Sequence, residues 1–469
     1  MALTDSQIKS ILSEMAGTKS SFPAYSPVSA SGNGLYATVD EAVATVSACQ
    51  AEFVLLPIKV RAEVIAAMRT AALDNAEHLA RLAHEETGYG NVAHKTLKNQ
   101  LAANKTPGLE DFEPRTYTGD DGLTLVEGAP YGVIGSITPS TNPTATVINN
   151  SISMVTGANG VVFNPHPGAK KASNEAVRIL NQAIFKVCGI GSLLGTIKDP
   201  TAKTGKELMD HPQIRILAIT GGEAVVALAM KSGKKVIAAG PGNPPVIVDE
   251  TADIDKAAKD IVRGASFDNN VLCIAEKEVF VLRPVADRLI DGMVAAGAYL
   301  ADEAEMQKIA DTVLTKGEHG YAPSRAFVGR SAKHILTESG IHTAKDPVLV
   351  ICRCQADHPL VATEMLMPIV PIVAADSFQE AVKQAVIAEN GYLHTAIMHS
   401  KNVDNLTFAA RALDTTIFVK NAPSFAGLGF EGEGYTTLTI STPTGEGLTS
   451  AKNFVRSRRC TLSGSFRII

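Results

Sequence analysis

Short runs of β-branched residues alternate with helix-like segments from Gly132 onward, and this alternation restricts the possible folds more than any other feature. The strand-like runs are 133–137, 160–163, 214–219 and 235–238. The helix-like segments between and after them are 144–155, 169–187 and 222–232. A second alternating set covers 255–397, with strand-like runs at 279–282 and 369–373. This pattern is typical of βαβ units around a parallel sheet. The sequence therefore predicts an α/β fold.

Length and composition limit the class of protein. At 469 residues the chain exceeds the size of a single hydrophobic core, so two or three lobes are expected. Its 45% hydrophobic and 19% charged residues and net charge of −5 are ordinary for a soluble enzyme. No basic cluster indicates nucleic acid, and the short basic run at 456–459 predicts a solvated or inter-subunit position. No apolar run indicates a membrane span and no secretory signal is recognisable, so we expect a cytoplasmic protein.

The cysteines separate one candidate nucleophile from incidental thiols. There are six of them, at Cys49, Cys188, Cys273, Cys352, Cys354 and Cys460. They are too sparse and irregular for a disulfide framework, and the Cys352–Cys354 pair has no second pair to complete a zinc site. The sequence therefore predicts no metal site, and five of the six cysteines are interpreted as buried or incidental.

Cys273 follows the stretch Phe267-Asp268-Asn269-Asn270-Val271-Leu272, and a second loop, Pro139-Ser140-Thr141-Asn142-Pro143, precedes it by about 130 residues. A thiolate attacks a carbonyl productively only if the resulting oxyanion is stabilised, and an Asn amide with a backbone N–H is a common way to do so. Alone, Cys273 would be interpreted as a core thiol and Asn142 as a turn residue. Together the two segments indicate covalent catalysis on an aldehyde.

With the surrounding chain, these segments resemble the aldehyde dehydrogenase superfamily, and within it the branch that passes the acyl group to coenzyme A (CoA). The likeness covers about 34–459. It is carried by the stretches at 130–144, 164–168 (Asn-Pro-His-Pro-Gly), 219–222 (Ile-Thr-Gly-Gly), 239–245 (Ala-Gly-Pro-Gly-Asn-Pro-Pro) and 267–275. The resemblance implies two Rossmann-like parallel-sheet domains and a β oligomerisation arm.

The resemblance also implies the catalytic roles. Cys273 would form a thiohemiacetal with the aldehyde, and the Asn142 amide with the Cys273 backbone N–H would hold the oxyanion. Hydride transfer to NAD would then leave a thioester on Cys273. Ile274, which follows the nucleophile, is assigned to the same catalytic group.

Ala239 is informative because of what it lacks. In hydrolytic members of the family a glutamate at the aligned position activates the water that cleaves the thioester. Alanine has no proton-accepting group, so the thioester should persist until the thiol of CoA attacks it. Two alternatives are a different carboxylate acting as base and an alignment slipped by one residue.

The expected NAD contacts come from several loops. The turn Thr220-Gly221-Gly222 offers backbone N–H groups at a helix N-terminus for the pyrophosphate. Glu364 matches the Glu that holds the nicotinamide ribose, and Leu366 replaces an aromatic residue beside the nicotinamide. Asn164 stands where hydrolytic members have a ribose-contacting Lys, which leaves NAD or NADP open, and His166 has a structural or a cofactor role. The remaining predicted cofactor contacts are Thr138, Pro139, Ser140, Ala239 and Gly240.

The two ends of the chain predict associations. Residues 4–16 are predicted to form an amphipathic helix with an apolar stripe of Ile8, Ile11, Leu12 and Met15, and residues 17–34 a flexible tether. This arm either folds back on its own enzyme or docks within a bacterial microcompartment, as such helices do in acylating relatives. Alternation at 117–127 and 435–440 predicts strands, and the family resemblance implies that they form an arm that extends another subunit's sheet, giving a homodimer or a dimer of dimers.

The predicted function is NAD-dependent oxidation of a short aliphatic aldehyde, propionaldehyde or acetaldehyde, to its acyl-CoA by a ping-pong route. The alternatives are a reductase of an acyl phosphate that uses the same cysteine chemistry and an inactive scaffolding relative. The predicted domains are a helix and tether (1–34), an NAD-binding domain (35–114 and 131–240), a catalytic domain (241–433) and an oligomerisation arm (115–130 and 434–469).

Overall fold

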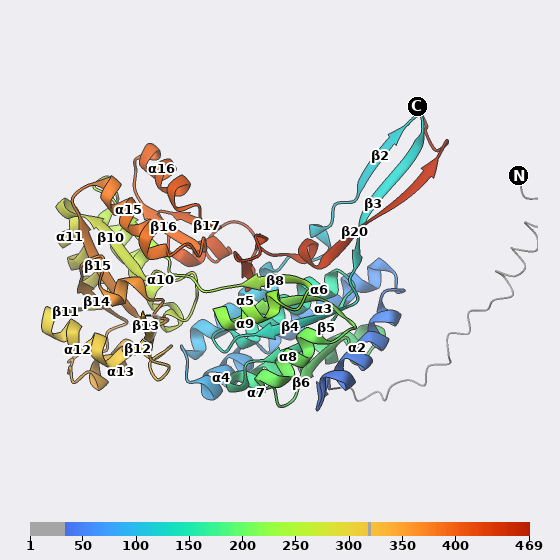
Figure 1. Cartoon of the computed structure of the whole chain (residues 1–469), viewed down its shortest axis with the longest axis horizontal. Coiled ribbons are helices and arrows are strands. Elements are labelled where there is room, and N and C mark those ends of the chain that lie inside the picture. The colour runs from blue at the N-terminus through green and yellow to red at the C-terminus, as the bar shows by residue number, and fades with distance from the viewer. Residues whose placement is uncertain (1–32, 318–319) are drawn as a thin grey trace, which may run out of the picture. The chain divides into compact units, whose positions relative to one another are not determined.

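The computed structural model describes residues 33–317 and 320–469. The predicted helix at 4–16 and almost all of the tether lie outside the described residues. Two parallel sheets and one three-stranded antiparallel sheet organise the described part (Figure 1). The α/β prediction is therefore confirmed.

The first sheet has six parallel strands in the order β1-β6-β5-β4-β7-β8. They are β1 (Leu35–Tyr36), β4 (Val133–Thr138), β5 (Gly160–Pro165), β6 (Leu194–Ile197), β7 (Ile214–Thr220) and β8 (Lys235–Ala239). Every residue of β4 and β5 is buried, as expected for central parallel strands that are covered on both faces.

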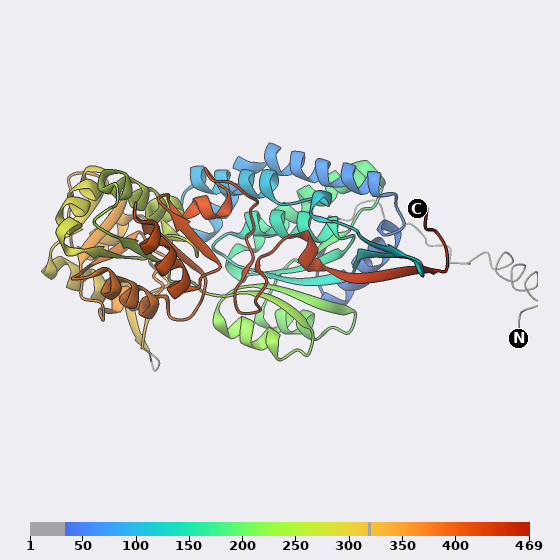
Figure 2. The ribbon, with the colours of Figure 1, turned by 90° about the horizontal axis from the view of Figure 1, so that it is seen from above.

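Helices cover both faces of this sheet (Figure 2). Successive residues of β4 enter two different cores, Ile134 in one and Val133 in the other. The first core includes residues of α3 (Ile58–Asp74), α4 (Ala76–Thr87), α5 (Val92–Lys105), α6 (Pro143–Thr156) and α7 (Lys170–Cys188). The second includes residues of α2 (Val39–Phe53), α8 (Ala202–Asp210) and α9 (Glu223–Met230). Three helices, α2, α3 and α4, thus follow one another between residues 39 and 87.

The second sheet has seven parallel strands in the order β11-β14-β15-β10-β9-β16-β17. They are β9 (Pro245–Val248), β10 (Glu278–Leu282), β11 (Ala298–Ala301), β14 (Leu349–Arg353), β15 (Ile369–Ala375), β16 (Thr395–His399) and β17 (Ile417–Lys420). The core on one face includes α10 (Ile254–Ser266) and α11 (Arg283–Ala295), and the core on the other includes α12 (Glu303–Val313), α13 (Ala332–Glu338), α14 (Pro359–Ala362), α15 (Phe378–Glu389) and α16 (Val403–Leu413).

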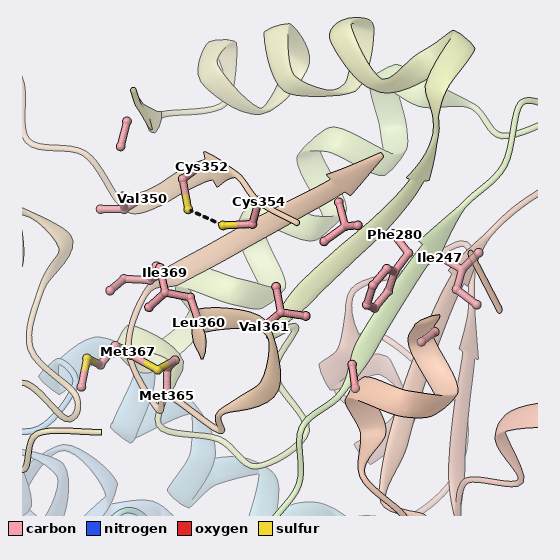
Figure 3. Packing of buried hydrophobic residues seen from close by; sticks show 14 of the residues in the cluster. Ile247, Phe280, Val350, Cys352, Cys354, Leu360, Val361, Met365, Met367 and Ile369 are labelled. Carbon is pink, nitrogen blue, oxygen red and sulfur yellow. Dashed lines mark hydrogen bonds between the residues drawn. The ribbon is translucent and has the colours of Figure 1, made fainter. Parts of the chain in front are cut away.

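Cys352 lies on β14 and Cys354 just after it, and both belong to the core formed by α12 to α16, together with Met365 and Met367 (Figure 3). Their sulfur atoms are 3.6 Å apart, and both thiols are free. No group of His, Cys, Asp and Glu that could hold a metal ion occurs in 33–317 and 320–469. The pair is therefore part of the packing of this core.

The third sheet consists of β2 (Arg115–Gly119), β3 (Gly122–Pro130) and β20 (Val455–Ser463), with β3 in the middle and all pairs antiparallel. The strand-like pattern at 117–127 is thus a hairpin, and the basic run at 456–459 lies exposed on β20. The prediction of a strand at 435–440 was wrong. Of this segment only Ile440 is in a strand, Ile440–Ser441 (β18), which pairs with Gly447–Leu448 (β19).

The short hairpin of β12 (Leu314–Gly317) and β13 (Gly320–Pro323) and five 3-10 turns complete the part of the fold that the structure describes. These turns are η1 (Leu109–Asp111), η2 (Pro167–Ala169), η3 (Phe267–Asn270), η4 (Ser424–Leu428) and η5 (Ala451–Phe454). Within the described ranges, no helix is both long and apolar enough to cross a membrane.

Candidate active site

One cavity of about 640 Å³ contains every site residue predicted from the sequence. Its lining includes Thr138, Pro139, Ser140, Asn142, Asn164, His166, Thr220, Gly221, Gly222, Ala239, Gly240, Cys273, Ile274, Glu364 and Leu366. The structure therefore brings these residues together, and their individual roles remain predictions.

The topology explains this convergence. Residues 139–142 follow β4, His166 follows β5, and Gly221 and Gly222 follow β7, so the first sheet contributes the carboxyl ends of its strands. The second sheet contributes segments that precede β9, β10 and β15. Ligands of open parallel sheets bind at the carboxyl edge, which is the edge used here by the first sheet.

The loop that carries Cys273 is held by buried polar groups. Lys277 Nζ donates to the backbone oxygens of Asn270 (3.0 Å) and Leu272 (3.2 Å), and also bonds to the Asn270 side chain. Asn270 Nδ2 in turn donates to the backbone oxygens of residues 265 (2.8 Å) and 276 (2.9 Å). The three residues 268–270 all have positive φ values between 50° and 64°. This left-handed run is unusual for non-glycine residues and marks a tightly constrained turn ahead of the nucleophile.

Burial raises the pKa of the Cys273 thiol well above its ordinary value, and the nearby Glu364 carboxylate adds to this effect. Lys277 and Lys98 act in the opposite direction by favouring the thiolate. The free thiol is therefore protonated near pH 7, and its proton must leave as the sulfur attacks a carbonyl.

Asn142 is the N-cap residue of α6, yet its side chain makes no capping hydrogen bond. Instead its Oδ1 accepts a hydrogen bond from Lys98 Nζ at 2.5 Å, and its Nδ2 donates to Thr141 Oγ1 at 3.3 Å. An Asn at an N-cap ordinarily bonds to the first helical turn. The side chain is therefore directed by Lys98 and not by the helix that it precedes.

Ala239 is the last residue of β8 and faces the cavity. Glu364 is the single carboxylate among the described residues that line this cavity. Its Oε1 accepts a hydrogen bond from the Gly242 N–H at 3.2 Å, and burial raises its pKa to about 7. Leu366, two residues further on, has a φ of +52°, and its carbonyl accepts the N–H of Gly329 at 2.9 Å.

Asn164 and His166, which also line the cavity, make hydrogen bonds within the protein. Asn164 Oδ1 accepts the Thr204 hydroxyl at 2.6 Å, and His166 Nδ1 accepts the N–H of Gly168 at 3.1 Å. The His166 bond is a local turn cap, and both the structural and the cofactor role of this residue stay predictions. Burial and the charge of Arg325, which also lines the cavity, lower the pKa of His166.

Sequence reasoning missed several buried polar residues around Cys273. These are Lys95, Lys98, Asp268, Lys277 and His394. His394 directly precedes β16 and packs closely against Gly242. A Cβ built on Gly242 would lie 2.8 Å from His394 Cγ and 2.9 Å from the Cys273 carbonyl oxygen. Lysines and aspartates are common on protein surfaces, so nothing local in the sequence distinguishes these buried ones.

Comparison with known proteins identifies the family of this chain. The chain is 48% identical over 462 residues to propanal dehydrogenase (CoA-propanoylating) of Salmonella typhimurium, covering 98% of both chains. A propionaldehyde dehydrogenase from the Clostridium phytofermentans fucose utilisation bacterial microcompartment superposes with a TM-score of 0.90 at 46% identity, over 93% of this chain and all of that one. Rhodopseudomonas palustris propionaldehyde dehydrogenase, solved with bound CoA and an acylated cysteine, superposes with a TM-score of 0.89 at 45% identity, over 92% of this chain and 98% of that one. The model of the aldehyde dehydrogenase family matches residues 24–435, and the chain belongs to this family.

Proposed function

We propose that this enzyme oxidises a short aliphatic aldehyde, propionaldehyde or acetaldehyde, to its acyl-CoA, with NAD as hydride acceptor. One observation carries the proposal: Cys273 and Asn142 line the same cavity as Ala239, which the family resemblance aligns with the base of hydrolytic members. The relative named as a CoA-propanoylating propanal dehydrogenase, and the propionaldehyde dehydrogenase solved with bound CoA and an acylated cysteine, support the same conclusion.

Cys273 Sγ forms a bond to the aldehyde carbon as its thiol proton passes to solvent water, and the carbonyl oxygen becomes an oxyanion. The Asn142 amide and the Cys273 backbone N–H donate hydrogen bonds to that oxyanion. Collapse of the tetrahedral adduct expels hydride from carbon and leaves an acyl thioester on Cys273. The thiol of CoA then takes the acyl group and regenerates the free cysteine.

The cavity fits the dinucleotide at the ends of the first sheet. A Cβ built on Gly222 would meet no atom within 4 Å, so the turn after β7 leaves open space for a phosphate. Thr138 Oγ1 is buried without a hydrogen-bond partner among the described residues and can serve a ligand. Thr220, Gly221 and Gly222 would contact the pyrophosphate and Glu364 the nicotinamide ribose. When bound, NAD accepts the hydride.

With propionaldehyde and NAD but no CoA, we expect one burst of NADH per active site, followed by very slow turnover. The thioester accumulates because Ala239 supplies no base to activate water. Stopped-flow absorbance measures the burst, and NMR identifies the product. Sustained NADH formation with propionate as product would contradict the acylating assignment.

Restoring the base should restore hydrolysis, so Ala239→Glu is expected to convert the single burst into continuous NADH formation without CoA. Ala239→Gln is the matched control, because it adds a side chain of the same size without a proton-accepting carboxylate. Continuous turnover in both variants would show that altered packing, and not the base, opens the thioester to water.

The three-stranded sheet is proposed to join subunits into a dimer or a dimer of dimers. Both outer strands, β2 and β20, are largely exposed, and Tyr117 and Leu462 present apolar side chains on them. Unpaired strand edges of this kind are ready templates for another chain.

The N-terminal segment is proposed to associate with a microcompartment, as its apolar stripe suggests and as the origin of the Clostridium relative supports. Deleting residues 1–16 should leave turnover and oligomeric state unchanged and abolish pelleting with shells. Steady-state kinetics, sedimentation and pelleting measure these three properties. A loss of activity or of the oligomer, with pelleting intact, would favour an arm that braces its own enzyme.

A further inference from the structure

Two lysines of α5, Lys95 and Lys98, are almost completely buried and face one buried aspartate, Asp268. Their side chains are 3% and 5% exposed, and that of Asp268 is 0% exposed. Lys95 Nζ lies 3.0 Å from Asp268 Oδ2, and Lys98 Nζ contacts the same oxygen. Burying three charges is unfavourable unless they are paired, so this cluster needs an explanation beyond packing.

The cluster connects the two loops that carry the proposed chemistry. Lys98 Nζ donates to Asn142 Oδ1 at 2.5 Å, and Lys95 Nζ donates to the Thr141 carbonyl at 3.4 Å. Asp268 lies five residues before Cys273 in the loop that leads to the nucleophile. The lysines therefore contact the oxyanion-donor loop and the nucleophile loop at once.

Asp268 is itself fixed by its surroundings. Its Oδ1 accepts the N–H of Asn91 at 2.9 Å, and its own N–H donates to His94 Nδ1 at 2.8 Å. Gly90 leaves the space that the carboxylate occupies, since a Cβ there would lie 1.8 Å from Asp268 Oδ1. The carboxylate is thus a rigid anchor for Lys98.

We propose that Lys98 is a positioning residue that fixes which end of the Asn142 amide faces the reacting carbonyl on Cys273. An asparagine side chain can rotate by half a turn and exchange its oxygen and nitrogen. A protonated lysine only donates hydrogen bonds, so it selects the Asn142 oxygen and leaves the NH₂ group to serve the oxyanion. Asp268 keeps the ammonium in place. This inference rests on the function proposed above.

The test is a double-mutant cycle on the full-length enzyme, using the NADH burst with propionaldehyde and NAD. Lys98→Met is expected to lower the burst rate constant by about 10- to 100-fold, with the KM for propionaldehyde changed by less than about threefold, because the lost interaction acts in the transition state. In an Asn142→Ala background, where no amide remains to be oriented, the same change should lower the burst by less than about twofold.

Lys105→Met is the matched control, because Lys105 lies on the same helix and bonds to the backbone oxygens of Gly429 (2.6 Å) and Gly432 (3.0 Å), away from Asn142. The burst rate constant of this variant should stay within about twofold of the wild-type value. If Lys98→Met does not fold, Lys98→Gln leaves Asp268 paired with Lys95 and should reproduce the loss, because the Gln amide can donate or accept and so selects neither end of Asn142. Equal losses with and without Asn142, or a normal burst in a folded Lys98 variant, would overturn the inference. A wild-type enzyme without a burst would remove the proposed function as well.

Discussion

Replacing Cys273 by alanine is expected to lower turnover by about 10⁴-fold or more while NAD binding stays near that of the wild type. The thiol makes the covalent bond on which every later step depends, whereas the proposed dinucleotide contacts come mainly from residues 138–140 and 220–222. Acyl-enzyme formation is measured by intact mass after incubation with propionaldehyde and NAD, and NAD binding by calorimetry. The variant should show no acyl adduct.

Cys188→Ala is a suitable control for this experiment. Cys188 ends α7, contacts the carbonyl oxygen of Ile184 at 3.4 Å and does not line the cavity. Its removal should leave turnover within about twofold of wild type. If Cys273→Ala retained turnover within about tenfold of wild type, Cys273 would not be the nucleophile.

The central strands of the first sheet were predictable because their local residue composition indicates that they are buried. The runs at 133–137 and 160–163 became β4 and β5, each extended by one or two residues. Buried parallel strands are nearly continuous in apolar and β-branched residues, which makes them easy to recognise. The loops at the carboxyl ends of these strands then converge by topology, and segments that precede strands of the second sheet complete the same cavity.

The three-stranded sheet was harder to predict, because its strand β20 forms only by pairing with β3. Val455–Ser463 contains three arginines and is largely exposed, so its own sequence gives little β signal, and it is a strand because β3 pairs with it. The alternation at 435–440 has another cause. Thr437 and Thr439 direct their hydroxyls to Asn149 (3.3 Å) and Asn150 (3.0 Å) of α6, and the N–H of Leu438 also donates to Asn149 at 3.0 Å. Buried threonines produced a strand-like pattern without a strand.

The Lys98–Asp268 contact could not be inferred from sequence, because 170 residues separate its partners. A lysine at a helical position and an aspartate near a cysteine are individually ordinary. Only the fold places α5 between the loops that carry Asn142 and Cys273, so the side chain that orients the proposed donor has no local motif.

Asn142→Asp is expected to lower turnover by about 1000-fold or more with little loss of stability. Removal of one oxyanion donor typically lowers turnover by about 100- to 1000-fold, and the carboxylate adds a negative charge beside the developing oxyanion. Stability should persist because the aspartate keeps the shape of asparagine and can accept the Lys98 hydrogen bond now made to Oδ1. The NADH burst and thermal unfolding measure the two effects.

Asn142→Ala separates the two causes of the loss, because it removes the donor without adding a charge. Its turnover should therefore fall by about 100- to 1000-fold, less than that of the aspartate variant. Which of the two variants has the lower turnover depends on which end of the Asn142 amide faces Cys273. If the amide oxygen faced the substrate, the aspartate would remove no donor and the alanine variant would be the slower one. An aspartate variant within about tenfold of wild type would therefore exclude Asn142 as the oxyanion donor.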